Sequence, residues 1–464
     1  MSKTSALPLS ALTALTPLDG RYRERLSELA PFVSEYGLIK TRVEVEIKYL
    51  LALSEVGVVR SFSTSEKKLL NELAEHLSDR DVLEVKEIEQ TTRHDVKAVE
   101  RMLRKKLGDT SLKDILEKIH FGLTSEDINN LSYRLMLYRG IQEVLIPKLQ
   151  ELLDSLTLLS EQNKSLPMLA RTHGQAAVTT TLGKEIVIFA TRLSKQLRQL
   201  HGQKLTGKLN GAVGNFNALA LTYPDIDWVT FSEKFVMSLG LVPNLYTTQI
   251  NTYDDVIEYF QLLERINNII IAFDQDMWRY ISDHWFVQEV KKGEVGSSTM
   301  PQKVNPIDFE NSEGNLGLAN SLLEFMARKL SASRLQRDLT DSTTIRNLST
   351  VLAYSLLGIK SVLTGLSRVR PNEAAILDAL TNDWTILTEG VQTILRDANV
   401  SDPYSLVANL SRGQHIGEKE WVEWIRTLPI SEELKKTLRE LTPQSYQGLA
   451  VKLTERALKE IKKK

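Results

Sequence analysis

Two long stretches of the chain contain neither glycine nor proline, the residues that most often interrupt a helix. They run from Asn244 to Lys292 and from Leu318 to Leu357. In the first stretch, apolar residues recur every three or four positions, at Ile257, Phe260, Leu263, Ile266, Ile270, Phe273, Met277, Ile281 and Trp285. This spacing predicts the apolar face of one very long helix. About 36 helical residues would span roughly 54 Å.

Two earlier segments show the same helical spacing. One contains Leu182, Ile186, Phe189, Leu193, Leu197 and Leu200, and the other contains Ile141, Leu145, Leu149, Leu152, Leu156 and Leu159. Pro147 lies within the second segment and is expected to kink the helix or to mark its first turn. Alternating runs typical of strands are nearly absent, so the predicted fold class is mainly α. Such long helices need partners along their whole length, which favours a bundle shared between subunits over a large monomeric bundle.

Composition narrows the classes of function. The 464 residues suggest two to four domains, and 58 basic against 59 acidic residues leave a net charge of −1. This balance predicts no nucleic-acid and no membrane partner. The chain has no cysteine, which excludes disulfides, thiolate zinc sites and cysteine nucleophiles. The first 18 residues do not resemble a signal peptide, and the longest uncharged stretch, 235–253, is too polar to span a membrane, so we expect a cytoplasmic protein.

The pattern along the chain predicts three helical domains. Short helices and charged turns are expected up to residue 121, followed by the long helices and then by a more charged segment. The predicted domains are 1–121, a central bundle at 122–368 that carries the polar loop 293–306, and 369–464.

Several familiar catalytic devices are missing from the sequence. Neither G-x-x-x-x-G-K-[ST] nor G-x-G-x-x-G occurs, Ser297 is not in a G-x-S-x-G elbow, and no H-E-x-x-H pair is present. We therefore expect neither a metal nor a cofactor. An enzyme with this sequence should work by acid–base chemistry and charge stabilisation.

Polar segments interrupt the helical pattern, and three of them have simple structural explanations. The pair of Arg21 and Tyr22 in segment 19–22 can contact a phosphate, but such pairs are common by chance. Segment 91–97 places His94 between Arg93 and Asp95, where the carboxylate can orient the imidazole, and a surface helix explains it equally well. Segment 120–128 has the spacing of a relaxed capping box, which predicts a helix start and also suits an anion site.

Two further polar segments favour chemistry more strongly. Segment 171–175 places His173 beside a glycine in a polar loop, where an imidazole can act as a general acid, although a structural role is equally compatible. Segment 293–306 follows the longest predicted helix and combines two glycines, two serines, a lysine and an asparagine. Such a loop can close over a ligand.

The run from Gly296 to Asn305, GSSTMPQKVN, closely resembles the signature of the fumarase/aspartase superfamily. Further segments are similar to the adenylosuccinate lyase family within it: 19–22, 92–96, 124–127, 171–175, 208–215, 247–250 and 336–346. The resemblance covers nearly the whole chain and thins after Arg370. One residue departs from the family pattern, because Gln302 stands where adenylosuccinate lyases usually have histidine and argininosuccinate lyases tend to have glutamine.

The resemblance implies a three-domain homotetramer with a long central helix bundle and active sites shared between subunits. It implies β-elimination of fumarate from adenylosuccinate, giving AMP, and from the succinyl-aminoimidazole-carboxamide ribotide, giving AICAR, as a C–N lyase without cofactor. By resemblance, Ser297 is the base and His173 the acid. The substrate-binding residues implied are Arg21, Tyr22, Arg93, His94, Asp95, Thr124, Ser125, Gln249, Lys303, Asn305, Arg337, Ser342, Thr343, Thr344, Ile345 and Arg346.

Three alternatives remain at this point. Another lyase of the superfamily, chiefly argininosuccinate lyase, differs by not needing Arg21, Arg337 and Arg346 for a nucleotide phosphate. A catalytically silent relative would keep the helices, but the intact Ser297 and Lys303 argue against it. A metal-dependent hydratase lacks support from ligand spacing.

Overall fold

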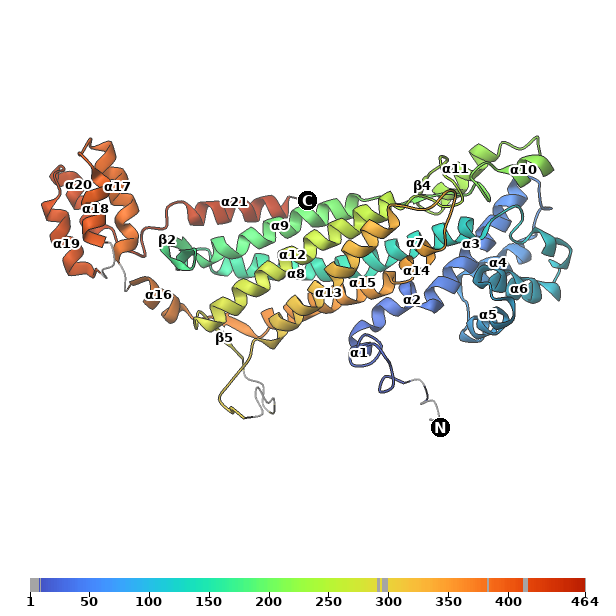
Figure 1. The fold of residues 1–464 in the computed structure, drawn as a ribbon, viewed down its shortest axis with the longest axis horizontal. Helices are drawn as coiled ribbons and strands as arrows, with labels where there is room; N and C mark the ends of the chain where they lie inside the picture. The colour runs from blue at the N-terminus through green and yellow to red at the C-terminus, as the bar shows by residue number, and fades with distance from the viewer. Residues whose placement is uncertain are drawn as a thin grey trace. The chain divides into compact units, whose positions relative to one another are not determined.

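The computed structural model describes residues 8, 10–289, 293, 299–381, 384–411 and 416–463. Within them, helices dominate and the strands form three two-stranded sheets (Figure 1). The predicted mainly helical fold class is therefore confirmed. The contacts divide the chain into two compact units, one of residues 1–148, 198–267 and 314–358, the other of residues 149–197, 268–313 and 359–464. We call them unit 1 and unit 2.

Unit 1 is organised around the buried helix α3 (Glu35–Glu55), which contacts α2 (Ala30–Val33) and α7 (Ser125–Arg139). The helices α4, α5 and α6 lie together beside it (Figure 1). Its other elements are α1 (Arg23–Leu26), η1 (Ser27–Leu29), α4 (Thr64–Glu75), α5 (Asp79–Thr92), α6 (Asp95–Gly108), η2 (Lys113–Lys118), η3 (Gly140–Leu145), β3 (Thr206–Gly207), α10 (Asn217–Thr222), α11 (Trp228–Ser238), β4 (Val242–Pro243) and α14 (Thr340–Ile345).

Unit 2 contains a β-hairpin and a cluster of short helices near the C-terminus. The indole of Trp421 is fully buried in that cluster and donates a hydrogen bond to the Leu438 carbonyl oxygen at 3.2 Å. The elements are β1 (Pro167–Thr172), β2 (Gln175–Thr181), β5 (Phe286–Gln288), β6 (Val369–Pro371), α16 (Glu373–Thr381), η4 (Trp384–Leu387), α17 (Thr388–Asp397), α18 (Pro403–Ser411), α19 (Glu418–Thr427), α20 (Glu432–Glu440) and α21 (Ala450–Lys462).

The long helices cover most of the predicted apolar segments, but Ile141 and Leu145 lie in the π-helical segment η3 before α8 (Ile146–Gln162) begins. The unit boundary falls inside each of α8, α9 (Leu182–Gly202), α12 (Asp254–Ser282), α13 (Ile307–Leu330) and α15 (Leu348–Leu366). Pro147 is the second residue of α8, directly after the π-helical segment η3, so it marks the first turn of a new helix. The apolar spacing therefore reflects real helix faces.

The longest helix is shorter than the apolar spacing suggested. α12 has 29 residues and ends at Ser282, whereas the apolar periodicity continues to Trp285. The backbone turns at His284, which has a left-handed φ of 61°, and Phe286–Gln288 then pairs antiparallel with Val369–Pro371. Trp285 is buried after the helix end, so its match to the helical spacing came from core packing and not from the helix.

The second stretch without glycine or proline is also not one helix. Residues 331–339 separate α13 from α14, and Leu335 has a left-handed φ of 52°. Asp338 accepts hydrogen bonds from the backbone N–H groups of Arg334 at 3.1 Å and Thr340 at 2.8 Å, which replaces helical hydrogen bonds with a side-chain cap. The non-helical segment 331–339 is important for the site described below because it contains Arg337.

The predicted domain boundaries near residues 121 and 368 stay a prediction. One apolar segment, Thr340–Leu366, is long enough to cross a membrane by composition, but 67% of its most apolar window is buried within the fold. A buried segment of this kind is typical of a core helix.

Candidate active site

The start of α7 is the structural centre of the candidate site in unit 1. Thr124 precedes the helix, and its backbone N–H donates to Asp127 Oδ2 at 2.9 Å, while the N–H of Asp127 donates to the Thr124 carbonyl oxygen at 2.9 Å. The helix start predicted from segment 120–128 is thus confirmed. This geometry leaves the side chain of Ser125, the first helical residue, available for other contacts.

A fully buried ion pair anchors the neighbouring loops to this helix start. Lys208 Nζ lies 3.1 Å from Asp127 Oδ1 and donates to the carbonyl oxygens of Gly211 at 2.9 Å and Gln249 at 2.8 Å. Asp127 Oδ1 also accepts from the backbone N–H groups of Asn210 and Gly211. The pair therefore holds together three segments that are distant in sequence: the start of α7, residues 208–211 and the segment around Gln249. This role explains why the segment 208–215 belongs to the same sequence pattern as the other segments of the site.

The side chain of His94 has a defined tautomer. Its Nδ1 accepts a hydrogen bond from the backbone N–H of Lys97 at 3.1 Å, so it caps the first turn of α6. Because Nδ1 accepts, the ring is neutral and the proton resides on Nε2. Nε2 lies 3.2 Å from Ser125 Oγ and donates to it. The Ser125 hydroxyl hydrogen can then point to a bound acceptor.

Asp95 is held by arginines and not by its neighbour His94. Its Oδ2 lies 2.6 Å from Nη2 of the buried Arg42 and 3.4 Å from Nη2 of Arg346, whereas the His94 ring nitrogen is 3.9 Å from Oδ1. Burial raises the pKa of the Asp95 carboxyl, but the charge and hydrogen bond of Arg42, the N–H of Val96 and the charge of Arg346 outweigh burial and lower that pKa. Asp95 therefore remains a carboxylate that positions Arg346.

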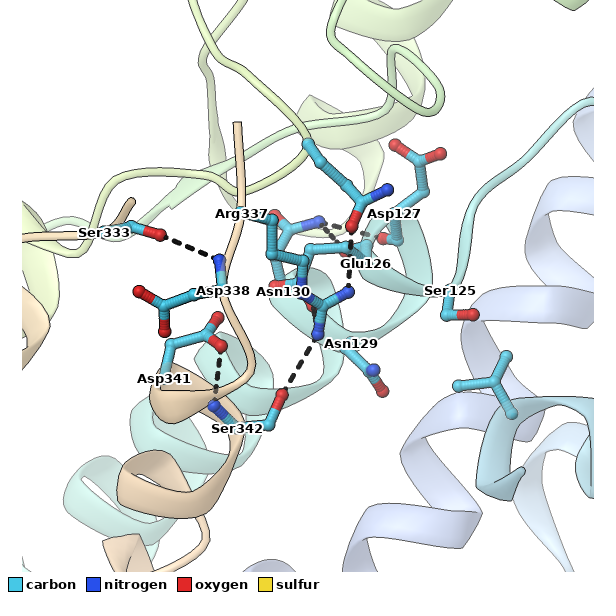
Figure 2. A network of polar contacts seen from close by, with 12 residues as sticks. Ser125, Glu126, Asp127, Asn129, Asn130, Ser333, Arg337, Asp338, Asp341 and Ser342 are labelled. Carbon is cyan, nitrogen blue, oxygen red and sulfur yellow. Dashed lines mark hydrogen bonds and ion pairs between the residues drawn. The ribbon is translucent and has the colours of Figure 1, made fainter. Parts of the chain in front are cut away.

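Arg337 joins three segments on the other side of the helix start. Its Nη1 donates to Gln249 Oε1 at 3.2 Å and its Nη2 donates to Ser342 Oγ at 3.0 Å. Nη2 also lies 3.4 Å from Oε2 of Glu126, the second residue of α7. Figure 2 shows Arg337 between the first turn of α7 and Ser342, with Ser125 on the far side of the helix start.

The N-terminal turn and Arg346 line one cavity of about 490 Å³ in unit 1. The cavity wall includes Asp19, Arg23, Tyr133 and Arg346. The expected Arg21 is exposed and lies over the Tyr22 ring at 6.0 Å, and neither of these two lines the cavity. The N-terminal turn therefore lines the same cavity as Arg346, but the side chains of Arg21 and Tyr22 do not.

The remaining predicted residues of unit 1 have mixed positions. Arg93 is exposed and ends α5 with a left-handed φ of 53°. Thr343 is exposed on α14, whereas Thr344 and Ile345 are buried, and the Thr344 hydroxyl donates to the Thr340 carbonyl oxygen at 2.9 Å. The latter two stabilise the short helix that presents Ser342.

In unit 2, His173 lies at the tip of the β1–β2 hairpin. His173 and Gly174 have φ values of 54° and 75°, and these two residues connect Thr172 to Gln175 in a turn with both φ values positive. His173 is exposed, and its imidazole makes no hydrogen bond to the part of the chain that the structure describes. Arg171 steadies the hairpin base by contacting Asp283 at 2.8 Å and by stacking over Trp285 at 4.2 Å.

The polar loop of unit 2 is described only in part. Ser297, the predicted base, lies outside the described residues. Lys303 is exposed and donates its backbone N–H to the Met300 carbonyl oxygen at 3.1 Å, and Asn305 is half-exposed shortly before α13 begins. The side chain of Gln288 donates to the Val304 carbonyl oxygen at 3.0 Å, which attaches this part of the loop to β5.

Sequence reasoning overlooked three charged residues that shape the site. Glu126 lies inside segment 124–127, where the predicted cap involves Thr124 and Asp127 and gives Glu126 no role. Lys208 lies in a recognised segment without an assigned role. Arg42 is 1% exposed on α3, but several other charged residues surround it in the sequence of that helix, so no sequence signal distinguishes it.

The arrangement in unit 1 suits recognition of an anion. Arg337, Ser125 and Ser342 offer donors around the start of α7, and Arg346 offers donors beside Asp95. Asp95 and Glu126 each hold one of the two arginines in place. Among the described residues, no group of three or more His, Asp or Glu side chains has the arrangement of a metal site.

Comparisons with known proteins place the chain among lyases. A family model described as Lyase matches residues 20–319, and one described as Adenylosuccinate lyase C-terminal matches residues 333–447. The chain is 47% identical to adenylosuccinate lyase of Haemophilus influenzae, over 97% of this chain and 100% of that protein. It is 44% identical to the adenylosuccinate lyases of Escherichia coli and Dictyostelium discoideum, in each case over 97% of this chain and 99% of the relative.

Solved structures with low sequence identity share the fold. A fumarate lyase from Mesorhizobium sp. superposes with a TM-score of 0.76 at 16% identity, over 94% of this chain and 97% of that one. The β-carboxy-cis,cis-muconate cycloisomerase of Acinetobacter calcoaceticus gives a TM-score of 0.73 at 16% identity, over 94% and 98%. These two proteins therefore share the fold of this chain.

Proposed function

Because this chain belongs to the adenylosuccinate lyase family, we propose that it splits adenylosuccinate into AMP and fumarate by β-elimination, and that it also releases fumarate from the succinyl-aminoimidazole-carboxamide ribotide to give AICAR. The observation that carries this proposal is the similarity to adenylosuccinate lyases over 97% of the chain. The donors around the start of α7 support it, since both substrates are nucleotides with a phosphate.

The chemical problem is to remove a weakly acidic Cβ proton and to expel an amine. The electron pair of the Cβ–H bond becomes the second bond of fumarate, and the pair of the C–N bond leaves with the nitrogen, which must be protonated. Negative charge builds on the neighbouring carboxylate before the C–N bond breaks, so fixed donors at that carboxylate lower the barrier. The reaction needs a base, an acid and an anion clamp, and no redox or Lewis-acid step.

We assign the base to Ser297 and the acid to His173, with Lys303 and Asn305 at the succinyl carboxylates. A serine hydroxyl is a weak base, so Ser297 needs an alkoxide stabilised by backbone N–H groups and Lys303 when the loop closes. The imidazole of His173 is exposed at a hairpin tip and makes no hydrogen bond to the described residues, which supports its role as a proton donor.

We assign the nucleotide end of the substrate to unit 1. Arg337, Ser342 and Arg346 are candidates for the phosphate, together with Arg21 and Tyr22. Ser125 and Thr124, with Gln249, are placed near the succinyl group, and the neutral His94 orients the Ser125 hydroxyl. Asp95 acts through Arg346.

We further propose a cytoplasmic homotetramer whose active sites are shared between subunits. The face of α13 that carries Gly314, Leu318 and Phe325 supports an assembly. Leu318 and Phe325 are 52% and 49% exposed, and a Cβ atom added at Gly314 would meet nothing within 4 Å. An exposed apolar helix face that includes a glycine, whose missing side chain leaves room for a neighbour, is typical of a surface that another helix covers.

The decisive experiment measures fumarate release from purified, chelator-treated protein. Adenylosuccinate and argininosuccinate are supplied in parallel. Release from adenylosuccinate alone is expected. Release from argininosuccinate alone would overturn the proposal in favour of the alternative that Gln302 suggests, and release from neither would indicate a catalytically silent relative.

Two substitutions test the assigned roles. Ser297→Ala should abolish turnover while AMP still binds, and His173→Ala should do the same. Mixing the two inactive variants should restore part of the activity if each site takes these residues from different subunits. Verified mixed tetramers that remain inactive would contradict sharing.

A further inference from the structure

A buried carboxylate lies where the nucleotide phosphate is expected to bind. Glu126 is 2% exposed, and its Oε2 lies 3.4 Å from Nη2 of Arg337. The separation is longer than a charge-assisted hydrogen bond, which is about 2.7–2.9 Å. Glu126 therefore holds Arg337 by charge, without the short hydrogen bonds that normally stabilise a buried carboxylate.

Arg337 has N–H donors that no described residue accepts. Its guanidinium has five N–H donors, and the contacts to Gln249 and Ser342 use two of them. Its Nε is buried and has no hydrogen-bond partner among the described residues, and its side chain is 19% exposed. An incoming anion can thus reach the exposed part of the Arg337 side chain.

The charges around Glu126 leave little to stabilise its ionised form. Lys208 is neutralised by Asp127, and Arg134 is neutralised by Asp255, which accepts at 2.9 and 3.0 Å. Asp341 is buried on α14 and accepts from the hydroxyl of Tyr253.

Among the described residues, Arg337 is consequently the one cation acting on Glu126 that is not paired with another carboxylate. Burial, together with the charge of Asp341, outweighs the lowering by Arg337, Lys208 and Arg134 and raises the pKa of the Glu126 carboxyl to about 7. The carboxyl therefore changes its charge near neutral pH.

We propose that Glu126 is a proton-linked positioning residue, which holds Arg337 in the free enzyme and takes up a proton from solvent when the nucleotide phosphate binds to Arg337. The inference rests on the proposed function, because it takes Arg337 as a phosphate ligand. The only bond formed is the O–H bond on the Glu126 carboxyl. A doubly negative phosphate brought to Arg337 repels an ionised Glu126, and protonation removes that repulsion while it frees the guanidinium for the ligand.

The proposal predicts the sign of the pH dependence. A site that takes up one proton on binding loses up to about tenfold in affinity for each pH unit above the pKa of the free carboxyl. A phosphate monoester has its second pKa near 6, so a phosphate that binds as a dianion releases protons below about pH 7. Proton uptake at pH 8 therefore cannot originate from the phosphate.

The test is calorimetric binding of AMP to the whole enzyme at pH 7, 7.5 and 8, in two buffers with different ionisation enthalpies. The unmodified enzyme should take up more than about half a proton per site at pH 8. Glu126→Gln should abolish the uptake and make the AMP affinity independent of pH. Asp227→Asn is the matched control: hydrogen bonds from Thr230 lower the pKa of the Asp227 carboxyl, so it is ionised throughout and its removal should leave the uptake unchanged.

Each failure has a distinct signature. AMP binding without proton uptake in the unmodified enzyme would overturn this inference and leave the proposed function intact. Uptake that persists in Glu126→Gln would assign the proton to another group and would equally overturn it. No AMP binding at any pH would overturn the nucleotide site, and the inference with it. Because the first measurement uses the unmodified protein, misfolding of a variant does not remove the test.

Discussion

At the scale of single residues, His94 performs two tasks with its two ring nitrogens. Nδ1 caps α6 and Nε2 contacts Ser125. Asparagine can reproduce the cap, since its side-chain oxygen accepts from the same position, whereas alanine cannot. His94→Ala should lower the free energy of unfolding by about 1 kcal/mol in urea denaturation, and His94→Asn should leave it nearly unchanged. Both should lose activity. Equal stability of the two variants would contradict the capping role.

A second residue-scale prediction concerns Asp274, which is 1% exposed on α12. Burial raises the pKa of its carboxyl well above the ordinary value, Glu313 raises it further, and the Ser312 hydroxyl lowers it only in part. A carboxyl whose pKa is raised by folding contributes stability that is complete below the unfolded-state pKa and lost as pH rises through the folded-state pKa.

The stability of the wild-type protein relative to Asp274→Asn should therefore fall as pH rises from about 4 towards 7, by up to about 1.4 kcal/mol per pH unit. Urea denaturation across this range measures the difference. A constant difference would show that Asp274 is not protonated in the folded protein.

At the scale of elements, the loop 208–215 and the segment around Gln249 depend on glycine. A Cβ atom at Gly214, which has a φ of +83°, would lie 2.2 Å from the Thr247 carbonyl oxygen. The contact cannot relax without moving the backbone of the segment that carries Gln249, and Thr248 of that segment donates to the Gln336 carbonyl oxygen. A local change here therefore reaches Arg337.

Gly214→Ala should destabilise the protein by more than about 2 kcal/mol and raise KM for the nucleotide substrate. Gly57→Ala is the matched control, because Gly57 also has a left-handed φ, of +78°, but its added Cβ meets nothing within 4 Å. It should cost about 1 kcal/mol and leave KM unchanged. Steady-state kinetics and urea denaturation distinguish the two substitutions. Equal effects of both would show that the strain of the left-handed φ, and not the contact with Thr247, causes the loss.

At the scale of the whole molecule, the proposed tetramer and the activity should be lost together. Leu318→Glu and Phe325→Glu place charge on the exposed apolar face of α13 and should shift the mass measured by light scattering to smaller species. Leu83→Glu on α5 is the control, since Leu83 is 63% exposed outside that face and should change neither mass nor activity. Full activity of a monomeric variant would contradict shared sites.

The sequence by itself determined the class of fold and the family. Apolar periodicity predicts helices because each long helix must bury one face, and the positions of α8, α9 and α12 follow it. The motifs around Ser297 and His173 predicted the family, and the lyase relatives confirm it. These features are local, so they can be read from residues close together in the chain.

Only the tertiary structure decided where helices stop and which charges meet. α12 ends at Ser282 because the chain turns to pair β5 with β6, and the break at 331–339 depends on a side-chain cap by Asp338. The pairing of Asp95 with Arg42 and of Glu126 with Arg337 joins residues 53 and more than 200 positions apart. The charge state of a buried group depends on such partners and on its distance from water, and neither is encoded in its neighbours along the chain.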